Sequence, residues 1–336
     1  MRMRSIGDDF AELLANLLDA GAPLRAALIY RLSEPMPEEL ALVQAEWGNV
    51  PVERRRLLMA RLAEASEVAF DLDFSAIATF ALQDPDAEVR KHAIETLWES
   101  EHPALMRLFI ELLQTDSDSR VRAAAAISLG RFVLAGELGT LPEATAREAE
   151  EALLCICQAG EDALEVRRRA LESLAFSGRA EVAPLIEEAS RHDDLKMRAS
   201  ALLAMGRSAD ERWGAQVLRA LDSREAELRF EAAHAAGELG LQPAIPRLVE
   251  LAHEPDREIK EAAIWALGEI GGPDAEQALY ALIEREADES LIESIEDALS
   301  MAALMAGEFA PLIFSLGDEE DDLLDFEDPD IEDDLG

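Results

Sequence analysis

The residues best able to do chemistry are few and scattered. The chain has five histidines and two cysteines. His234 precedes Glu238 by four residues on one face of a predicted helix, but a metal site needs further converging ligands, and no other histidine has a matching spacing. Cys155 and Cys157 point to different faces of a helix, so we interpret them as buried apolar residues in a reducing compartment. Because a glycine-rich phosphate loop and a Ser/His/Asp arrangement are also absent, the sequence predicts no catalytic residue, metal or cofactor.

A regular row of basic residues, the basic ladder, is more informative. Six basic residues, each preceded by an apolar one, recur at intervals of 32, 45, 31, 31 and 31 residues. They are Arg90, Arg122, Arg167, Arg198, Arg229 and Lys260. An arginine so placed is expected to run its stem along an apolar seam and offer its guanidinium to a carboxylate in an adjacent turn. The candidate carboxylates are Asp86, Asp118, Asp194 and Asp256. We interpret the ladder as a structural clamp between successive repeats; a line of anion sites is the alternative.

The residues around the ladder repeat with it. An alanine follows every ladder residue by three positions, and a glycine follows four of the six by eight positions. The alanines are Ala93, Ala125, Ala170, Ala201, Ala232 and Ala263. The glycines are Gly130, Gly206, Gly237 and Gly268, and the exceptions are Trp98 and Ala175. This agreement predicts tandem pairs of short helices, which must stack on neighbours because one pair cannot bury its apolar faces alone.

The clearest unit covers residues 254–285. Asp256 is expected to open its first helix, because a carboxylate accepts the unpaired N–H groups of the first turn. The glycines within residues 268–272 are expected to end this helix. A second helix is then predicted over residues 274–285, so the unit is one complete helix pair.

Three motifs carry a family resemblance. The segments are DPDAEVRKHAIETLW, VRAAAAISLG and REIKEAAIWALGEIGGPDA. They resemble the bacterial HEAT-like repeats, of the type also called phycobilisome-lyase-like, and the resemblance covers residues 37–306. It implies an all-α fold, a right-handed alpha-alpha superhelix of about eight helical pairs.

The resemblance implies several functions, because such arrays serve as scaffolds, adaptors, lyases and a few metalloenzymes. Some of these metalloenzymes hold a di-iron centre through His-Glu dipeptides placed just after the ladder position. No ladder residue of this chain is followed by such a dipeptide, so that oxygenase chemistry is excluded.

The sequence predicts three parts. Residues 1–36 form an N-terminal helical cap, residues 37–306 form the repeat array, and residues 307–336 form a disordered acidic tail. The interval of 45 marks an insertion over residues 131–147, where we expect a longer connection followed by a longer helix. We interpret it as a variant in loop length. The alternative is a segment that holds a ligand or partner.

Charge excludes several partners. The chain carries 31 Lys and Arg against 71 Asp and Glu, for a net charge of −40. Phosphate binding needs a basic stripe, so we expect neither nucleic acid nor anionic membranes as partners, and a protein partner with a basic surface instead. No apolar run approaches the roughly 18 residues of a membrane helix, so the protein is predicted to be cytoplasmic. The tail contains a candidate apolar motif, Leu323, Leu324 and Phe326.

The positions one, five and nine residues after each ladder residue form an outward stripe on the helices that carry the ladder. Six of its residues form a candidate protein-binding groove: Ile127, Phe176, Leu203, Phe230, His234 and Trp265. Burial against the curve of the array is the alternative for these side chains. We predict a non-catalytic protein-interaction scaffold that uses this groove and the tail. A bilin- or cofactor-handling lyase-like protein is the alternative, while the sequence names neither the partner nor the oligomeric state.

Overall fold

The computed structural model describes residues 6–305, except residues 20, 70, 161, 285 and 287. The predicted tail, with its motif of Leu323, Leu324 and Phe326, lies outside the described residues. Within them every regular element is an α-helix or a short 3-10 helix, as the predicted all-α repeat fold requires. No helix in this part of the chain is long and apolar enough to cross a membrane.

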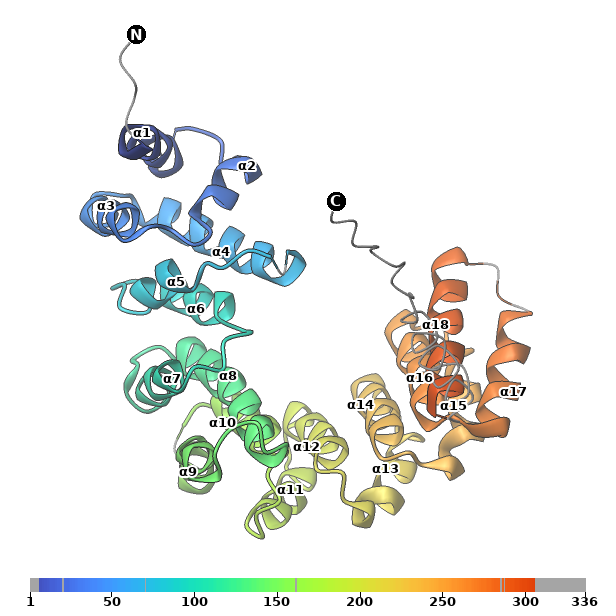
Figure 1. Ribbon diagram of the computed structural model, residues 1–336. Helices are drawn as coiled ribbons and strands as arrows, with labels where there is room; N and C mark the ends of the chain where they lie inside the picture. The colour runs from blue at the N-terminus through green and yellow to red at the C-terminus, as the bar shows by residue number, and fades with distance from the viewer. Residues whose placement is uncertain are drawn as a thin grey trace, which may run out of the picture. The chain divides into compact units, whose positions relative to one another are not determined.

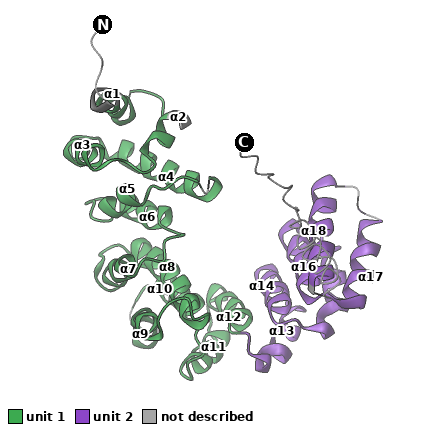
Figure 2. Ribbon diagram, viewed as in Figure 1, with its two compact units in different colours: residues 1–208 green, residues 209–336 purple. Residues whose placement is uncertain are grey.

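The chain divides into two compact units, residues 1–208 and residues 209–336 (Figure 2). Both units are built from helix pairs. The predicted limits of the cap and of the array, at residues 36 and 306, stay predictions.

Unit 1 has two layers of helices, which Figure 1 shows from blue to yellow-green. It opens with α1 (Ile6–Leu18), α2 (Ala26–Ile29) and the 3-10 helix η1 (Tyr30–Leu32). One layer then contains α3 (Pro37–Trp47), α5 (Ser75–Ala81), α7 (Pro103–Thr115), α9 (Glu143–Ala159) and α11 (Val182–Ser190). The other contains α4 (Val52–Val68), α6 (Ala87–Thr96), α8 (Ser119–Glu137), α10 (Leu164–Leu174) and α12 (Leu195–Arg207). Successive helices of this second-helix layer pack on one another.

Unit 2 repeats the arrangement, and a short 3-10 helix precedes two of its first helices. These are η2 (Glu211–Trp213) with α13 (Gly214–Ala220), η3 (Gln242–Ala244) with α15 (Ile245–Leu251), and α17 (Gly272–Ile283). The second helices are α14 (Ala226–Glu238), α16 (Arg257–Ile270) and α18 (Glu289–Met305). As in unit 1, the second helices stack directly, α14 on α16 and α16 on α18.

Aspartates begin five of the second helices that the structure describes, the fifth being Asp288 before α18. The side chain of Asp86 accepts hydrogen bonds from the backbone N–H groups of Glu88 and Val89, and that of Asp256 accepts from Glu258 and Ile259. Asp118 and Asp194 cap α8 and α12 in the same way. A cap of this kind satisfies donors that have no partner inside the helix and so fixes where the helix starts.

The core follows the repeat pattern. All six alanines that follow the ladder are completely buried, at 0% exposure. The glycines eight positions after the ladder permit close packing: a Cβ on Gly268 would lie 2.9 Å from the Cα of Ala298 in the next repeat. The expectation that Gly268 helps to end its helix is therefore wrong, because α16 continues to Ile270 and ends at Gly271, whose φ is +60°.

The insertion is helical rather than a long loop. The helix α8 continues to Glu137 and α9 begins at Glu143, so only residues 138–142 of the insertion expected over residues 131–147 lie between the two helices. The packing of α8 on α9 explains this extension. A Cβ on Gly136 would lie 2.3 Å from the Cβ of Ala146, so the two helices approach closely along the added turn.

Candidate protein-interaction surface

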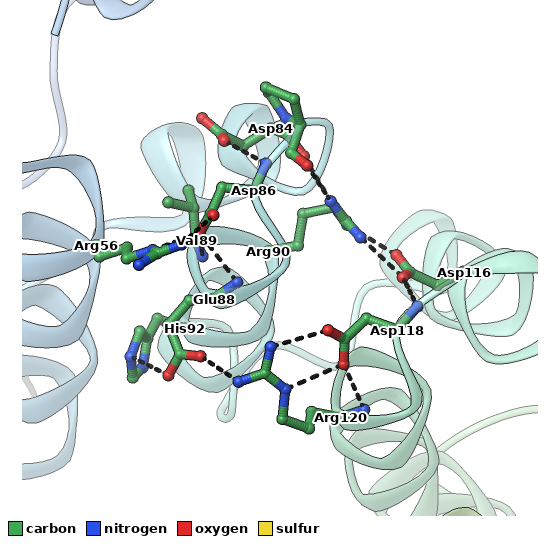
Figure 3. A network of polar contacts seen from close by, with 11 residues as sticks. Arg56, Asp84, Asp86, Glu88, Val89, Arg90, His92, Asp116, Asp118 and Arg120 are labelled. Atoms are coloured by element: carbon green, nitrogen blue, oxygen red, sulfur yellow. Dashed lines mark hydrogen bonds and ion pairs between the residues drawn. The ribbon is translucent and has the colours of Figure 1, made fainter. Parts of the chain in front are cut away.

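Four of the six ladder residues contact the next repeat in the described part of the chain, and Figure 3 shows the first of these contacts. Arg90 on α6 donates from Nε and Nη2 to the two carboxylate oxygens of Asp116, at 2.7 and 2.8 Å. Its Nη1 donates to the carbonyl oxygen of Asp84, 2.8 Å away. The guanidinium therefore binds the loop before its own helix and the loop before the next one. Planar two-point contact of this kind is what arginine provides and lysine does not.

The same geometry recurs along the chain. Arg122 donates from Nη2 to Asp162 at 2.7 Å and from Nη1 to the carbonyl oxygen of Asp116 at 2.7 Å. Arg229 binds both carboxylate oxygens of Glu254, at 3.0 and 2.7 Å. Lys260 approaches Glu286 at 3.8 Å. At these positions the basic side chain is therefore already paired with a carboxylate of the protein.

The carboxylates expected as ladder partners have another role. Asp86, Asp118, Asp194 and Asp256 are helix caps, and the ladder instead uses acids from the loop of the following repeat. Asp86 additionally binds Arg56 on α4, at 2.9 and 2.6 Å. That contact lowers the pKa of Asp86 to about 2, and the contact with Arg120 does the same for Asp118.

Two ladder residues have no carboxylate partner among the residues that the structure describes. Arg198 donates from Nη1 to the carbonyl oxygens of His192 and Asp193, at 2.9 and 2.8 Å. The buried Nε of Arg167 has no hydrogen-bond partner among the described residues. Arg167 lines a cavity of about 30 Å³ together with Cys157 and His192. The ladder is therefore weakest at the end of unit 1.

The six residues of the predicted groove all lie at or near the surface. Ile127 and Trp265 are exposed, at 53% and 37%. Phe176, Leu203, Phe230 and His234 are half-buried. None of the six belongs to the fully buried core of its unit, so each presents part of its side chain for contact.

Three of these residues form one continuous surface in unit 2, which we call the aromatic row: Phe230, His234 and Trp265. The rings of Phe230 and His234 lie 4.8 Å apart between centroids, and those of His234 and Trp265 are also 4.8 Å apart. The indole of Trp265 lies against Gly237, where a Cβ would approach its Cζ3 to 2.8 Å. Burial lowers the pKa of His234, so the middle ring is neutral near pH 7.

Unit 1 carries a buried polar cluster that the sequence did not reveal. Arg168 and Glu172 were expected on the outward stripe but are only 8% and 4% exposed. Ser200 on α12 donates to Glu172 at 2.5 Å and accepts from Nε of Arg168 at 2.9 Å. Arg169 donates to the second oxygen of Glu172 at 2.8 Å. The only sequence signal was the charged pair itself on a face of apolar neighbours, which does not disclose burial.

Metal and thiol chemistry find no support here. Among the described residues, no group of three or more His, Cys, Asp or Glu is placed to hold a metal ion. Cys155 is exposed and Cys157 is half-buried, so the interpretation of both as buried apolar residues is wrong. Desolvation raises the pKa of Cys157 to about 12, which keeps it a protonated, unreactive thiol.

Comparison with known proteins identifies the repeats. A family model described as HEAT repeats matches residues 75–151 and 214–300, which are α5 to α9 and most of unit 2. No curated protein matches the sequence. Stacked helix pairs of this kind define an α-helical tandem-repeat protein. The two matched segments are HEAT repeats.

Solved structures give distant likenesses. The CpcE–CpcF complex of phycocyanin lyase from Nostoc sp. is 18% identical, with a TM-score of 0.45, over 68% of this chain and 94% of that chain. Importin beta is 16% identical, with a TM-score of 0.47, over 88% of this chain and 47% of that chain. Human deoxyhypusine hydroxylase is 17% identical, with a TM-score of 0.33, over 88% and 96% of the two chains. These values carry no argument about ligands or partners.

Proposed function

We propose that this chain is a non-catalytic scaffold that binds a protein partner through its second-helix layer, with the aromatic row as the principal contact. HEAT repeats are a protein-interaction fold, and the observation that carries the proposal is the surface position of the aromatic row. Aromatic side chains supply large contact areas at little entropic cost, and they dominate the energetics of protein interfaces.

Acidic residues flank the aromatic row. Glu238 follows His234 by four positions, and Glu261 and Glu269 lie four positions before and after Trp265. A partner that covers the rings would therefore meet carboxylates on both sides. Together with the net charge of −40, this favours a partner with apolar anchors set in a basic surface.

The test begins with purification of the full chain and capture of its partners from a lysate of the source organism, identified by mass spectrometry. The affinity of each captured partner is then measured for the intact protein and for the double variant Phe230→Ala/Trp265→Ala. We expect a loss of about 2 kcal/mol or more for each anchor, because interface hot spots have that magnitude.

A matched control is available on the same unit. Tyr280→Ala/Met301→Ala also removes two exposed apolar side chains, 59% and 38% exposed, outside the row. This control should bind normally. A partner that binds the row variant as well as the intact protein, while the variant loses thermal stability, would show that the rings serve the core. A visible chromophore in the purified protein would favour the lyase-like alternative.

The acidic tail is a second part of the proposal, and it rests on the sequence alone. Twelve acidic residues and no basic ones follow Gly317, yet Leu323, Leu324 and Phe326 interrupt them. Pure solubilisation needs no such motif. Truncation after Leu316 should leave the helicity and melting temperature unchanged and abolish at least one partner. Retention of every partner would reduce the tail to a solubiliser. A cytoplasmic location is likewise proposed from the sequence.

A further inference from the structure

One position of the repeat supplies the acid that pairs with the ladder. It lies six residues before a ladder residue, and Asp116 occupies it where both its carboxylate oxygens bind Arg90. Glu254 occupies the same position in unit 2. In the loop before α12 this position is His192. A histidine offers no carboxylate to Arg167, the ladder residue of the preceding second helix α10.

A backbone contact shows that His192 takes the place of the acid. Asp118 N donates to Oδ1 of Asp116 at 2.8 Å, and Asp194 N donates to Nδ1 of His192 at 3.0 Å. The two side chains therefore hold the start of the following helix in the same way. Because Nδ1 of His192 accepts this bond, the neutral ring carries its proton on Nε2 and donates from there.

A cavity of about 30 Å³ lies beside His192. Residues from α9, α10, α11 and α12 line it, and Figure 1 shows these helices at the end of unit 1. Its polar lining consists of Cys157, Arg167, Glu188 and His192, and its other lining residues are apolar. The buried Nε of Arg167 has no hydrogen-bond partner among the described residues. One water needs roughly 10–15 Å³ of such space, so the cavity admits only a small species.

The groups around the cavity leave the charge of Arg167 without a counter-ion. Burial raises the pKa of the Cys157 thiol to about 12, so this side chain is a neutral S–H group. Glu188 is exposed, and no described acid, Glu188 included, forms an ion pair with Arg167. The neutral ring of His192 adds a further N–H group. Hydrogen-bond donors therefore predominate around the cavity.

We propose that this cavity binds one small monovalent anion, chloride, which replaces the carboxylate that the ladder has at other steps. Nε of Arg167 and the Nε2–H of His192 donate to the anion, and the thiol of Cys157 is a weaker donor. The small volume excludes phosphate, and the carboxylate of Glu188 disfavours any anion of higher charge. The bound chloride links α10 to the loop before α12. This inference does not depend on the proposed function.

Chloride NMR tests the site on the full protein. Sodium chloride is titrated at constant ionic strength, with sodium gluconate as the balancing salt because gluconate is too large for the cavity. The chloride nucleus relaxes faster when it is bound, so the intact protein should broaden the resonance, and the excess width should saturate. Arg167→Met should abolish this saturable broadening. Broadening that persists in this variant, when circular dichroism shows it to be folded, would overturn the proposal.

His192→Asp is the sharper variant, because it supplies the carboxylate from within the chain. The new side chain should pair with Arg167 as Asp116 pairs with Arg90, so the saturable chloride broadening should disappear. Ser223→Asp is a matched control, since it makes the same change of charge at the same position of the next repeat. This control should bind chloride normally. Chloride binding that His192→Asp retains, or that both variants lose equally, would overturn the proposal.

Hydrogen exchange measures what the anion does for the repeats. Chloride at about ten times its Kd should slow the exchange of α10 and α12 about tenfold in the intact protein, because a ligand stabilises its bound state by the factor 1 + [L]/Kd. In His192→Asp the exchange should be slow without chloride and should not respond to it. In a chloride-free buffer Arg167→Met should exchange like the intact protein. Equal exchange of the intact protein in chloride and in gluconate would show that no anion binds and would overturn the proposal.

Discussion

At the same two repeat positions, α10 carries Arg168 and Glu172 while α14 carries Phe230 and His234. In unit 1 the charged pair is buried against Ser200 of the next second helix. In unit 2 the rings remain at the surface and continue into Trp265. The same helix positions therefore carry buried polar contacts between repeats in unit 1 and a surface for binding in unit 2.

The ladder shows the opposite contrast. In unit 2 Arg229 has a two-point carboxylate partner in Glu254, whereas Nε of Arg167 in unit 1 has no hydrogen-bond partner among the described residues. Where the ladder is incomplete, the buried polar cluster lies one residue further along α10. Successive repeats are thus held together by different contacts, and each kind of contact should respond differently to mutation and pH.

The largest effect should come from the buried cluster. Glu172→Ala removes the buried carboxylate that accepts hydrogen bonds from Ser200 and Arg169. Arg168 and Arg169 keep their contacts with Glu165, so we expect a loss of about 3 kcal/mol of stability. His234→Ala, at the same position of its repeat, removes only ring contacts and should cost about 1 kcal/mol. Hydrogen exchange with mass spectrometry reads α10 and α14 separately. A smaller effect for Glu172→Ala than for His234→Ala would contradict the comparison.

The ladder gives the next effect. Arg229→Met removes charge-assisted hydrogen bonds to Glu254 and to the Ser223 carbonyl, and should cost about 2 kcal/mol. Arg167→Met keeps the apolar stem and removes a nitrogen that has no partner, so its cost should be within about 0.5 kcal/mol. Urea unfolding of the two variants measures the difference. Equal costs would mean that packing of the stems, rather than pairing, holds the ladder.

Mild acid should affect unit 2 before unit 1. Burial lowers the pKa of His234 below its ordinary 6.5, so the unfolded state takes up a proton first as pH falls. The stability of unit 2 should therefore decline below about pH 6.5. His234→Phe keeps a ring in the row and should remove this slope. Hydrogen exchange of α14 at several pH values is the measurement, and an unchanged slope in the variant would assign it to other groups.

The smallest effect belongs to the aspartate caps of unit 1. Asp86 has a folded pKa of about 2 against an ordinary 3.8, so its contribution is present above pH 3.8 and is lost as pH falls through about 2. Asp86→Asn should flatten the acid unfolding of α6 over this range only. Circular dichroism during acid titration follows it. A change near neutral pH would show that Asp86 does more than cap its helix and bind Arg56.

Sequence periodicity by itself determined the helix pairs. The starts of α6 and α16, the buried alanines and the row of basic residues all follow from contacts within a few residues, because helix geometry places positions three and four apart on one face. Those features could be predicted without knowing how the repeats stack. The resemblance to HEAT-like repeats extended this prediction from the helix pairs to the fold.

Only the tertiary structure decided which groups these side chains meet. Arg90 pairs with Asp116 and Arg122 with Asp162, contacts across 26 and 40 residues that depend on where the next loop lies. The burial of Glu172 and the exposure of Trp265 depend likewise on how closely one repeat approaches the next. The sequence pattern determines which face of a helix a residue occupies. The partner of a long side chain lies in another repeat, so it depends on the distance between the repeats.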